Sequence, residues 1–189
     1  MGIRTFFAID ISEAARDRLA EAQRRMADPA AKVKWVAPEL LHVTMKFLGD
    51  VADDCLAEVC EAGARAAAEA QPFDFAVRRV VCVPPGGRQL RMIWVGVEYE
   101  PGTMDRLAER LENAMEPLGF PREKRKFHPH ITLARVKFAE DPSVLRAHAA
   151  EFAETDFGTT RADQLVAYSS KLTPAGPIYA PLAKAPLGG

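Results

Sequence analysis

Two short apolar stretches carry the residues whose types and spacing could do chemistry. In each stretch a His is followed two positions later by a Thr, as His42 and Thr44 in the first and His130 and Thr132 in the second. Side chains two positions apart on an extended strand point to the same face, so each stretch presents an imidazole beside a hydroxyl. The apolar residues between them point the other way, into a core. The sequence therefore predicts two copies of one small reactive unit.

Two imidazoles that meet in one site suit in-line displacement at phosphorus. Imidazole titrates near neutral pH, so one ring can accept a proton while the other donates one. The hydroxyls of Thr44 and Thr132 can hydrogen-bond phosphate oxygens, and a fixed cation can offset their charge. Arg135 follows the second pair, but regular alternation from His130 puts it on the opposite face. We therefore expect Arg135 to reach a phosphate only from a twisted or bulged strand end.

Other chemistries fit the two pairs less well. Two His on separate strands could ligate a metal, but Thr is a poor ligand and neither stretch contains Asp or Glu. The chain has neither a GxSxG nucleophile elbow nor a GxxxxGK phosphate loop. We therefore expect no metal and no cofactor. The plain structural alternative is two His side chains that are merely satisfied within a sheet.

The composition indicates an ordinary soluble globular protein. The 189 residues are 48% hydrophobic and 27% charged, with a formal net charge of −1. This balance supports a sizeable core and provides no global field that attracts nucleic acid or membrane. We expect one domain over residues 1–189, made of two lobes without a linker, and a monomer.

Cysteine usage and the N-terminal residues indicate the compartment. Cys55, Cys60 and Cys82 form no CxxC pair, and reduced, mostly buried thiols are typical of a cytoplasmic protein. No apolar run reaches the length of a membrane span, and residues 1–10 become polar too soon for a signal peptide. The expected location is the cytoplasm, with no membrane partner.

Hydrophobic periodicity and turn residues predict the elements that position the two pairs. Helical patterns cover about 13–26, 55–70, 102–118 and 142–151. We expect Gly49 and Asp50 to close the first His–Thr strand, and a bulge near Arg78 and Arg79 in the strand at 73–83. The remaining strand patterns cover 3–9, 33–36, 90–97, one region within 157–169, and 178–185.

The order of these elements predicts the fold class. Hairpins with interspersed helices indicate an α+β fold with antiparallel sheets. Each His–Thr strand is followed by a loop and a helix, so the chain looks like a degenerate duplication of one αβ unit. Both pairs can then meet in one cleft only if the two halves fold against each other.

The pairs and their flanks also resemble a known family. His42 to Met45 and His130 to Leu133 match the doubled His-x-Thr-x motif of the 2H phosphoesterase superfamily. Residues 4–10, 34–49 and 129–135 resemble the bacterial RNA 2′,3′-cyclic phosphodiesterase branch, also called 2′-5′ RNA ligase. Residues 165–182 resemble the C-terminal hairpin of that branch, so the resemblance covers nearly the whole chain.

The resemblance implies two pseudo-symmetric lobes, each an antiparallel sheet with helices packed outside, and a central cleft that carries both motifs. It implies hydrolysis of RNA ending in a 2′,3′-cyclic phosphate to a 2′-phosphate without metal or nucleotide, with tRNA fragments as one candidate substrate. By the same match His42 and His130 are the acid/base pair, and Thr44, Thr132 and Arg135 bind the phosphate. We assign His42 as the proton donor and His130 as the proton acceptor.

One departure and three minor candidates accompany this assignment. Relatives commonly carry Glu after the Tyr of the last hairpin, whereas Tyr168 is followed here by Ser169, which leaves the role of that carboxylate open. Phe47, His128 and Lys126 are candidate substrate contacts, since an aromatic ring can stack a base and a cation can meet the RNA backbone.

Three other functions remain open at this point. The same site could favour the reverse reaction, 2′-5′ ligation of RNA. It could instead hydrolyse a small cyclic nucleotide. A non-enzymatic alternative is a module that binds RNA ends, although binding alone would be served by Lys or Arg in place of the two His.

Overall fold

The computed structural model describes residues 2–174 and 176–188. Its strands are β1 (Gly2–Asp10), β2 (Ala31–Trp35), β3 (His42–Ala52), β4 (Phe73–Val83), β5 (Met92–Tyr99), β6 (His130–Ala139), β7 (Asp156–Ala162), β8 (Gln164–Leu172) and β9 (Pro177–Pro186). Its helices are α1 (Glu13–Met26), α2 (Leu56–Ala68), α3 (Met104–Met115) and α4 (Pro142–Ala150). Short 3₁₀ turns lie at Pro38–Leu40, Asp53–Cys55 and Glu116–Leu118.

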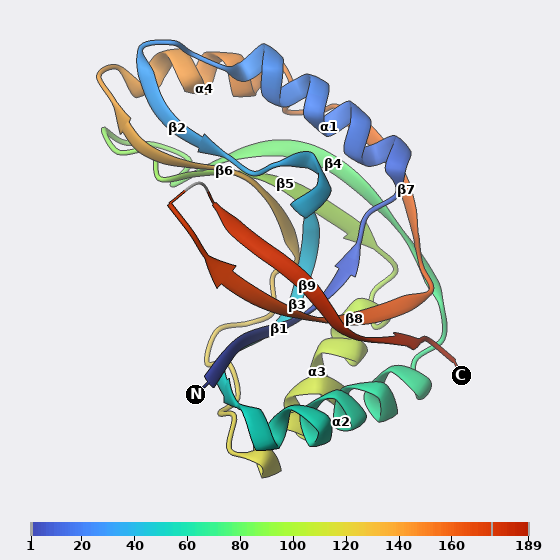
Figure 1. Cartoon of the computed structure of the whole chain (residues 1–189). Helices are drawn as coiled ribbons and strands as arrows, with labels where there is room; N and C mark the ends of the chain where they lie inside the picture. The colour runs from blue at the N-terminus through green and yellow to red at the C-terminus, as the bar shows by residue number, and fades with distance from the viewer. Residues whose placement is uncertain (1, 175, 189) are drawn as a thin grey trace.

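The strands form one curled antiparallel sheet that is nearly divided in two. Its order is β7-β4-β5-β6-β3-β1-β8-β9, and β2 also pairs with β6. The two His–Thr strands, β3 and β6, meet at the middle of this order, where Val43 lies opposite Ile131. The sheet therefore has two arms that are joined at the motif strands (Figure 1).

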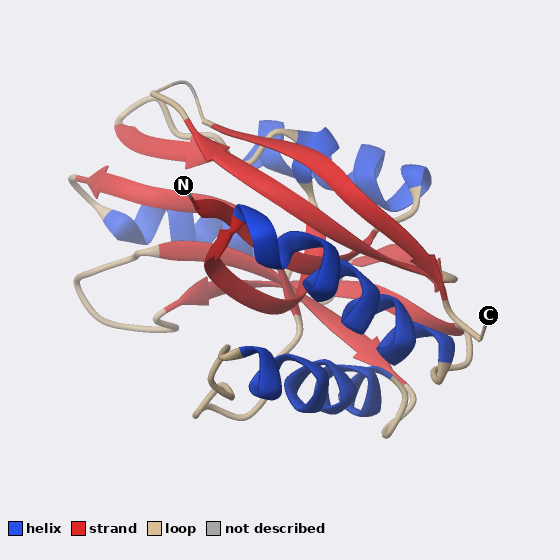
Figure 2. Cartoon of the chain, turned by 60° about the horizontal axis from the view of Figure 1, so that its bottom comes forward, coloured by secondary structure: helices blue, strands red, loops and turns tan. Residues whose placement is uncertain are grey.

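Each arm and its helices make one lobe. The β6 lobe comprises β2, β4, β5, β6 and β7, covered on the outside by α1 and α4, and the β3 lobe comprises β1, β3, β8 and β9, covered by α2 and α3. Figures 1 and 2 show the two helix pairs on opposite sides of the molecule, with the strands between them. The α+β fold of two lobes is confirmed.

The two lobes repeat the same local plan. In each lobe the motif strand has as its neighbour the strand that begins its half of the chain, β1 beside β3 and β5 beside β6. The helices α1 and α3 follow these two neighbours, and each packs against a strand of the opposite lobe. Because each half contributes a helix to the other lobe, the halves are folded against each other as a pseudo-twofold pair.

Local sequence explains where two of the helices begin. The hydroxyl of Ser12 accepts a hydrogen bond from the backbone N–H of Ala15 at the start of α1, and the carboxylate of Asp141 accepts one from Ser143 at the start of α4. Such side-chain acceptors satisfy N–H groups that the first helical turn leaves free. None of the helices within the described residues is both long and apolar enough to cross a membrane.

The expected bulge in β4 is confirmed. The register between β4 and β5 shifts between Arg78 and Val80, and Arg79 adopts a φ of 64°. The prediction that Gly49 and Asp50 close the first motif strand is wrong. Gly49 adopts a φ of 76° beside a register shift, so it accommodates a bulge, and β3 continues to Ala52 while pairing with β1.

Two further boundaries differ from the prediction. The region 157–169 holds two strands, β7 and β8, which separate at Asp163 and pair in different lobes. No Gly or Pro marks this change of lobe in the sequence, so the pattern showed one region. The third helix ends at Met115 rather than near 118, because a 3₁₀ turn with Pro117 and then Gly119 at a φ of 88° follow it.

Candidate functional site

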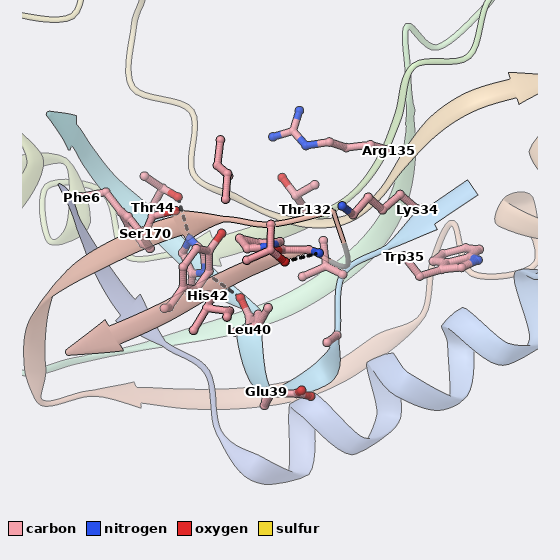
Figure 3. Close-up of a pocket in the computed structure, with 18 of the residues that line it drawn as sticks. Phe6, Lys34, Trp35, Glu39, Leu40, His42, Thr44, Thr132, Arg135 and Ser170 are labelled. Carbon is pink, nitrogen blue, oxygen red and sulfur yellow. Dashed lines mark hydrogen bonds between the residues drawn. The ribbon is translucent and has the colours of Figure 1, made fainter. Parts of the chain in front are cut away.

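A cleft of about 900 Å³ lies between the lobes and holds both His–Thr pairs. Its walls come from β1, β2, β3, β6, β8 and β9, and His42, Thr44, His130 and Thr132 are all among its lining residues. Figure 3 shows His42 and Thr44 on one side of this cleft, with Thr132 and Arg135 on the other. The two units that are far apart in the sequence therefore share one solvent-accessible space.

Each imidazole is held in the same way by its own strand. His42 Nδ1 lies 2.7 Å from the carbonyl oxygen of Leu40, and His130 Nδ1 lies 2.8 Å from that of His128. A carbonyl oxygen only accepts, so Nδ1 carries the proton in both rings and Nε2 is left for acid/base work. The Nε2 atom of His42 also lies 3.0 Å from the hydroxyl of Thr44.

A bulge in β6 brings Arg135 to the cleft. Trp94 of β5 is opposite Thr132 and Ile93 is opposite Ala134, so Leu133 is an extra residue in the ladder. One extra residue reverses the alternation of side chains along a strand. Arg135 therefore faces the same side as Thr132 and lines the cleft, which removes the obstacle that regular alternation posed.

Burial and neighbouring charges lower the pKa of both imidazoles. For His42, burial lowers the pKa below its ordinary value, the hydrogen bond to Leu40 and the carboxylate of Asp10 oppose this, and His130 adds to it. For His130, burial also lowers the pKa, the hydrogen bond to His128 opposes it, and the charges of His128 and Arg135 add to it. Thus the anion Asp10 lies near His42, whereas the permanent cation Arg135 lies near His130.

Aromatic rings hold the two imidazoles in different ways. The ring of His42 contacts both Phe6 and Tyr179, with centroid distances of 5.0 Å and 5.6 Å. The ring of His130 stacks on Trp94 at 3.9 Å and an interplanar angle of 23°. These contacts restrict how each imidazole can rotate and keep its Nε2 atom in one place.

The cleft gathers cations that the motif analysis missed. Arg4, Lys34 and Lys137 line it together with Arg135, and no ion pair between described residues involves any of the four. Unpaired cations in a cleft attract anions such as phosphates. Arg4 alternates with Phe6 on β1, a signal that was available in the sequence. The positions of Lys34 and Lys137 in the cleft depend on the pairing of β2 with β6, and no signal for this pairing was available in the sequence.

The three minor candidates lie in different surroundings. Phe47 lines the cleft, is 48% exposed, and has the guanidinium of Arg4 over its ring at 4.4 Å. His128 and Lys126 are exposed but are not among the lining residues of the cleft. The geometry thus brings Phe47 to the site and leaves the other two at its periphery.

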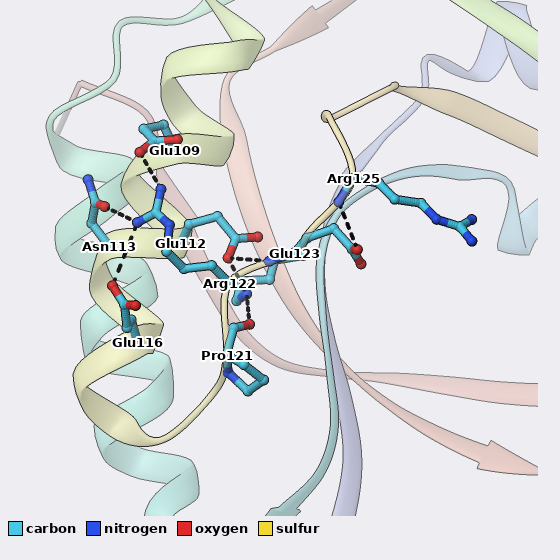
Figure 4. A network of polar contacts seen from close by, with 9 residues as sticks. Glu109, Glu112, Asn113, Glu116, Pro121, Arg122, Glu123 and Arg125 are labelled. Carbon is cyan, nitrogen blue, oxygen red and sulfur yellow. Dashed lines mark hydrogen bonds and ion pairs between the residues drawn. The ribbon is translucent and has the colours of Figure 1, made fainter.

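The basic segment that contains Lys126 is bound to helix α3 along part of its length. Arg122 contacts Glu109 and Asn113, and the backbone N–H of Glu123 donates to Glu112 at 3.2 Å (Figure 4). Arg122 therefore contributes to the attachment of this loop, and its charge is already offset by carboxylates.

Ser169, where relatives commonly carry Glu, contacts the backbone of β9, and a different residue supplies the carboxylate near His42. The hydroxyl of Ser169 donates to the carbonyl of Ala180 on β9, while its neighbour Ser170 lines the cleft. The carboxylate near His42 comes instead from Asp10, which accepts hydrogen bonds from the hydroxyl of Tyr168. The role of Asp10 is not evident from the sequence motifs, since its position opposite His42 depends on the register between β1 and β3.

The described residues offer no ready metal site. Nowhere in residues 2–174 and 176–188 do three or more His, Cys, Asp or Glu side chains gather as a metal ion requires. The groups that the cleft does offer are two imidazoles, two hydroxyls and several cations, which together can transfer protons and bind an anion.

A family model matches the chain twice. The model described as "LigT like Phosphoesterase" matches residues 9–94 and again residues 95–179. The two matches divide the chain between the two motifs, so each match contains one His–Thr pair. This agrees with the duplicated plan of the two lobes.

Curated proteins are similar over nearly their whole length. A Methanothermobacter thermautotrophicus protein named RNA 2′,3′-cyclic phosphodiesterase is 35% identical over 179 residues, which cover 95% of this chain and 96% of that protein. A Thermotoga maritima protein of the same name is 33% identical over 179 residues, covering 94% of this chain and 91% of that protein.

Solved structures have the same fold. The crystal structure of TT0787 of Thermus thermophilus is 30% identical with a TM-score of 0.82, covering 98% of each chain. Escherichia coli LigT complexed with 3′-AMP has a TM-score of 0.78 over 100% of each chain, at 23% identity, which is a likeness of fold.

Proposed function

The chain belongs to the LigT-like phosphoesterase family, and from this premise we propose that it hydrolyses RNA ending in a 2′,3′-cyclic phosphate to RNA ending in a 2′-phosphate. Its full-length relatives carry the name of this activity. The observation that carries the proposal is that His42 and His130 lie in one cleft, each with its Nδ1 atom held by a backbone carbonyl. The protein is accordingly a phosphodiesterase whose substrate is RNA.

The reaction needs one proton acceptor and one proton donor. Water attacks the phosphorus and loses a proton to the base, a new P–O bond forms, and the P–O3′ bond breaks. The departing O3′ takes a proton from the acid, which leaves a 3′-hydroxyl and a 2′-phosphate. After turnover the base holds a proton and the acid lacks one, so exchange with solvent restores both.

The neighbours of the two rings support one direction of proton flow. His42 lies near the carboxylate of Asp10, which favours its protonated form, so we assign it as the donor. His130 lies near Arg135, which favours its neutral form, so we assign it as the acceptor. The base then forms an imidazolium over the face of Trp94, where a cation–π contact favours the new charge.

Hydroxyls and a guanidinium complete the site in this proposal. Thr44 and Thr132 hydrogen-bond the non-bridging phosphate oxygens, whose negative charge increases in the transition state. Arg135 offsets that charge from the β6 side, to which the bulge at Leu133 turns it. No step in this scheme requires a metal ion or a nucleotide.

Product analysis tests the proposal directly. The purified protein is incubated with an oligonucleotide ending in 2′,3′-cyclic phosphate, with and without EDTA, and products are followed by phosphorus NMR. We expect the 2′-phosphate in both samples at equal rates. A 3′-phosphate product, or activity lost with EDTA and restored by a metal, would overturn the proposed mechanism. Tight binding without turnover would identify a binding module instead.

We propose fragments of tRNA as one physiological substrate, a monomer as the working form, and the cytoplasm as the compartment. The last rests on Cys55, Cys60 and Cys82, all of which are free thiols. Kinetics on tRNA fragments and on a cyclic mononucleotide, together with light scattering, test the first two.

A further inference from the structure

The two imidazoles face different residues across their neighbouring strands. Asp10 is directly opposite His42 in the register of β1 and β3. Residues directly opposite on an antiparallel pair have their Cβ atoms about 4.5–5.5 Å apart on the same face, so the carboxyl and the imidazole are neighbours. Asp10 is not among the residues that line the main cleft.

Tyr168 holds the carboxylate of Asp10 from the next strand. Its hydroxyl lies 3.0 Å from both carboxylate oxygens. The ring of Tyr168 packs on Phe6 at 5.5 Å, and Phe6 in turn contacts the ring of His42. The aromatic contacts and the hydrogen bond together restrict where the carboxylate can lie.

The other motif has a glycine where the first has this carboxylate. Gly96 is directly opposite His130 in the register of β5 and β6. A Cβ atom added at Gly96 would lie 2.8 Å from the carbonyl oxygen of Arg78, closer than real Cβ contacts. The backbone of β4 thus occupies the space that a carboxylic side chain at this position would need beside His130.

We propose that Asp10, held by Tyr168, is a positioning residue that acts through His42 and keeps this imidazole in its proton-donating form. The inference rests on the proposed function, because it specifies which ring protonates the leaving oxygen. No bond to Asp10 forms or breaks in the reaction.

Several groups face His42 and determine how its protonation follows pH. Asp10 on β1 raises the pKa of His42, whereas burial and the charge of His130 on β6 lower it. Tyr179 contacts the ring of His42, and Tyr168 packs on Phe6 beside it. Burial raises the pKa of both phenols, that of Tyr168 to about 12, so both stay neutral. Asp10 is thus the anion among these neighbours.

Other cations lie one shell further out. Arg16 on α1 acts on Tyr168, and Arg4 and Arg135 act on Tyr179. These cations act on the two phenols, whereas the pKa of His42 itself is raised by Asp10 and lowered by burial and by His130. Loss of the Asp10 charge leaves burial and His130 opposed by the hydrogen bond to Leu40.

The test is the pH dependence of kcat/KM for Asp10→Asn. The donor must be protonated, so removing the anion lowers the pKa of His42 and moves the alkaline limb of the profile to lower pH. We expect kcat/KM to fall about 10-fold relative to wild type on the alkaline limb, and to approach the wild-type value as the pH falls below the lowered pKa of His42. A pH titration of the His42 ring by NMR without substrate should show the same direction.

Tyr168→Phe separates the hydroxyl from the carboxylate. We expect a shift in the same direction and about 3-fold lower kcat/KM on the alkaline limb, since the carboxylate stays but is less well held. In the double variant with Asp10→Asn no further shift should occur, because Tyr168 acts only through Asp10. Additive shifts would remove Tyr168 from the proposal.

Tyr99 and Asp105 provide a matched control. The hydroxyl of Tyr99 donates to the carboxylate of Asp105 at 2.7 Å, the same pair of groups, and neither residue lines the cleft. Tyr99→Phe should leave the pH profile in place even if it lowers the melting temperature. The control thus separates loss of a buried tyrosine hydroxyl from loss of the contact with Asp10.

The outcomes distinguish this inference from the proposed function. A wild type without activity on cyclic-phosphate ends refutes the function, and the NMR titration still tests the electrostatic effect of Asp10 on His42. An active wild type with an unshifted Asp10→Asn profile refutes the positioning role. Asp10→Glu should restore most of the lost rate, whereas an Asp10→Asn variant that only melts earlier would show that Asp10 merely supports the start of α1.

Discussion

The motif strands β3 and β6 share the same local arrangement around their His, which we call the frame. In both, a backbone carbonyl two residues earlier holds Nδ1 of the His, the Thr follows at the second position, and a bulged residue comes next, Met45 in β3 and Leu133 in β6. In both, the second residue after the bulge faces the cleft again. The duplication thus preserves how the Nδ1 atom of each ring is held.

The strands differ in the charges that surround this frame. The residue that returns to the cleft is Arg135 in β6 but Phe47 in β3, where Arg4 of the neighbouring strand supplies the cation. The residue just before it is Ala134 in β6 but Lys46 in β3. Lys46 turns away from the cleft and pairs with Glu112 of α3 at 2.6 Å.

In the proposed mechanism, this difference lets one repeated unit serve once as the proton donor and once as the proton acceptor. A symmetric frame positions two equivalent imidazoles, and unequal neighbours give them unequal tendencies to hold a proton. The anion beside His42 and the cation beside His130 favour donation from the first and acceptance by the second. The predictions below test whether the frame or the charges matter more.

Loss of either imidazole should have the largest effect. We expect His42→Ala and His130→Ala each to lower kcat by at least about 10²-fold, since each removes one proton-transfer group from the same frame. The measurement is steady-state kinetics on an oligonucleotide ending in 2′,3′-cyclic phosphate, with thermal melting as a check on folding.

His148 on α4 is the matched control for these variants. Its Nδ1 lies 3.4 Å from the carbonyl oxygen of Met26, and it does not line the cleft. His148→Ala should retain wild-type kcat. If only one of the two motif variants lost activity, the equivalence of the two frames would be wrong.

Arg135→Gln should have the next largest effect. We expect kcat/KM to fall about 10- to 100-fold, because a charge-assisted contact to the phosphate is lost. Arg135 also lowers the pKa of His130. The acceptor must be neutral, so removing this cation raises that pKa and moves the acidic limb of the profile to higher pH, whereas Asp10→Asn moves the alkaline limb to lower pH.

Variants at Arg91 and Phe47 serve as comparisons for Arg135→Gln. Arg91→Gln removes an exposed guanidinium that does not line the cleft and should leave the profile unchanged. Phe47→Leu changes the residue that matches Arg135 in β3. If it costs as much as Arg135→Gln with the same shift in the acidic limb, the proposed charge asymmetry between the strands fails.

Lys34→Ala with Lys137→Ala should have the smallest effect. Both lysines lie on the β6 side of the cleft, where they suit the phosphates of RNA upstream of the cyclic end. We expect kcat/KM on an oligonucleotide to fall about 3- to 10-fold at low salt with a weaker salt dependence, and activity on a cyclic mononucleotide to stay unchanged.

Lys171 serves as the control for charge alone. It lies on β8 between Ser170 and Leu172, which both line the cleft, but it is not itself among the lining residues. Lys171→Ala should not alter the oligonucleotide kinetics. An equal loss on mononucleotide and oligonucleotide would mean that Lys34 and Lys137 contact the cyclic phosphate itself.

Much of the local structure could be predicted from the sequence. The strand at 73–83 and its bulge, and the helix at 13–26, were predicted at the residues where they occur. Periodicity and capping residues are local signals, so they locate such elements well. The division of 157–169 into β7 and β8 was missed, because it depends on which distant strands each part pairs with.

The sequence by itself determined the reactive groups. Alternation along a strand places His42 beside Thr44, and His130 beside Thr132, whatever the rest of the chain does. It also determined that two such units exist and that apolar residues back them. These features follow from neighbours in the chain, whose relative positions the backbone geometry restricts.

Only the tertiary structure decided which charged side chains surround those groups and which face of the sheet they occupy. The bulge that turns Arg135 into the cleft, and Asp10 opposite His42, depend on register between strands, and a shift of one residue would reverse the face of each side chain. Register is set by packing between distant segments rather than by local preference. The chemistry of the motifs was therefore readable from the chain, while the proposed direction of proton flow rests on the assembled sheet.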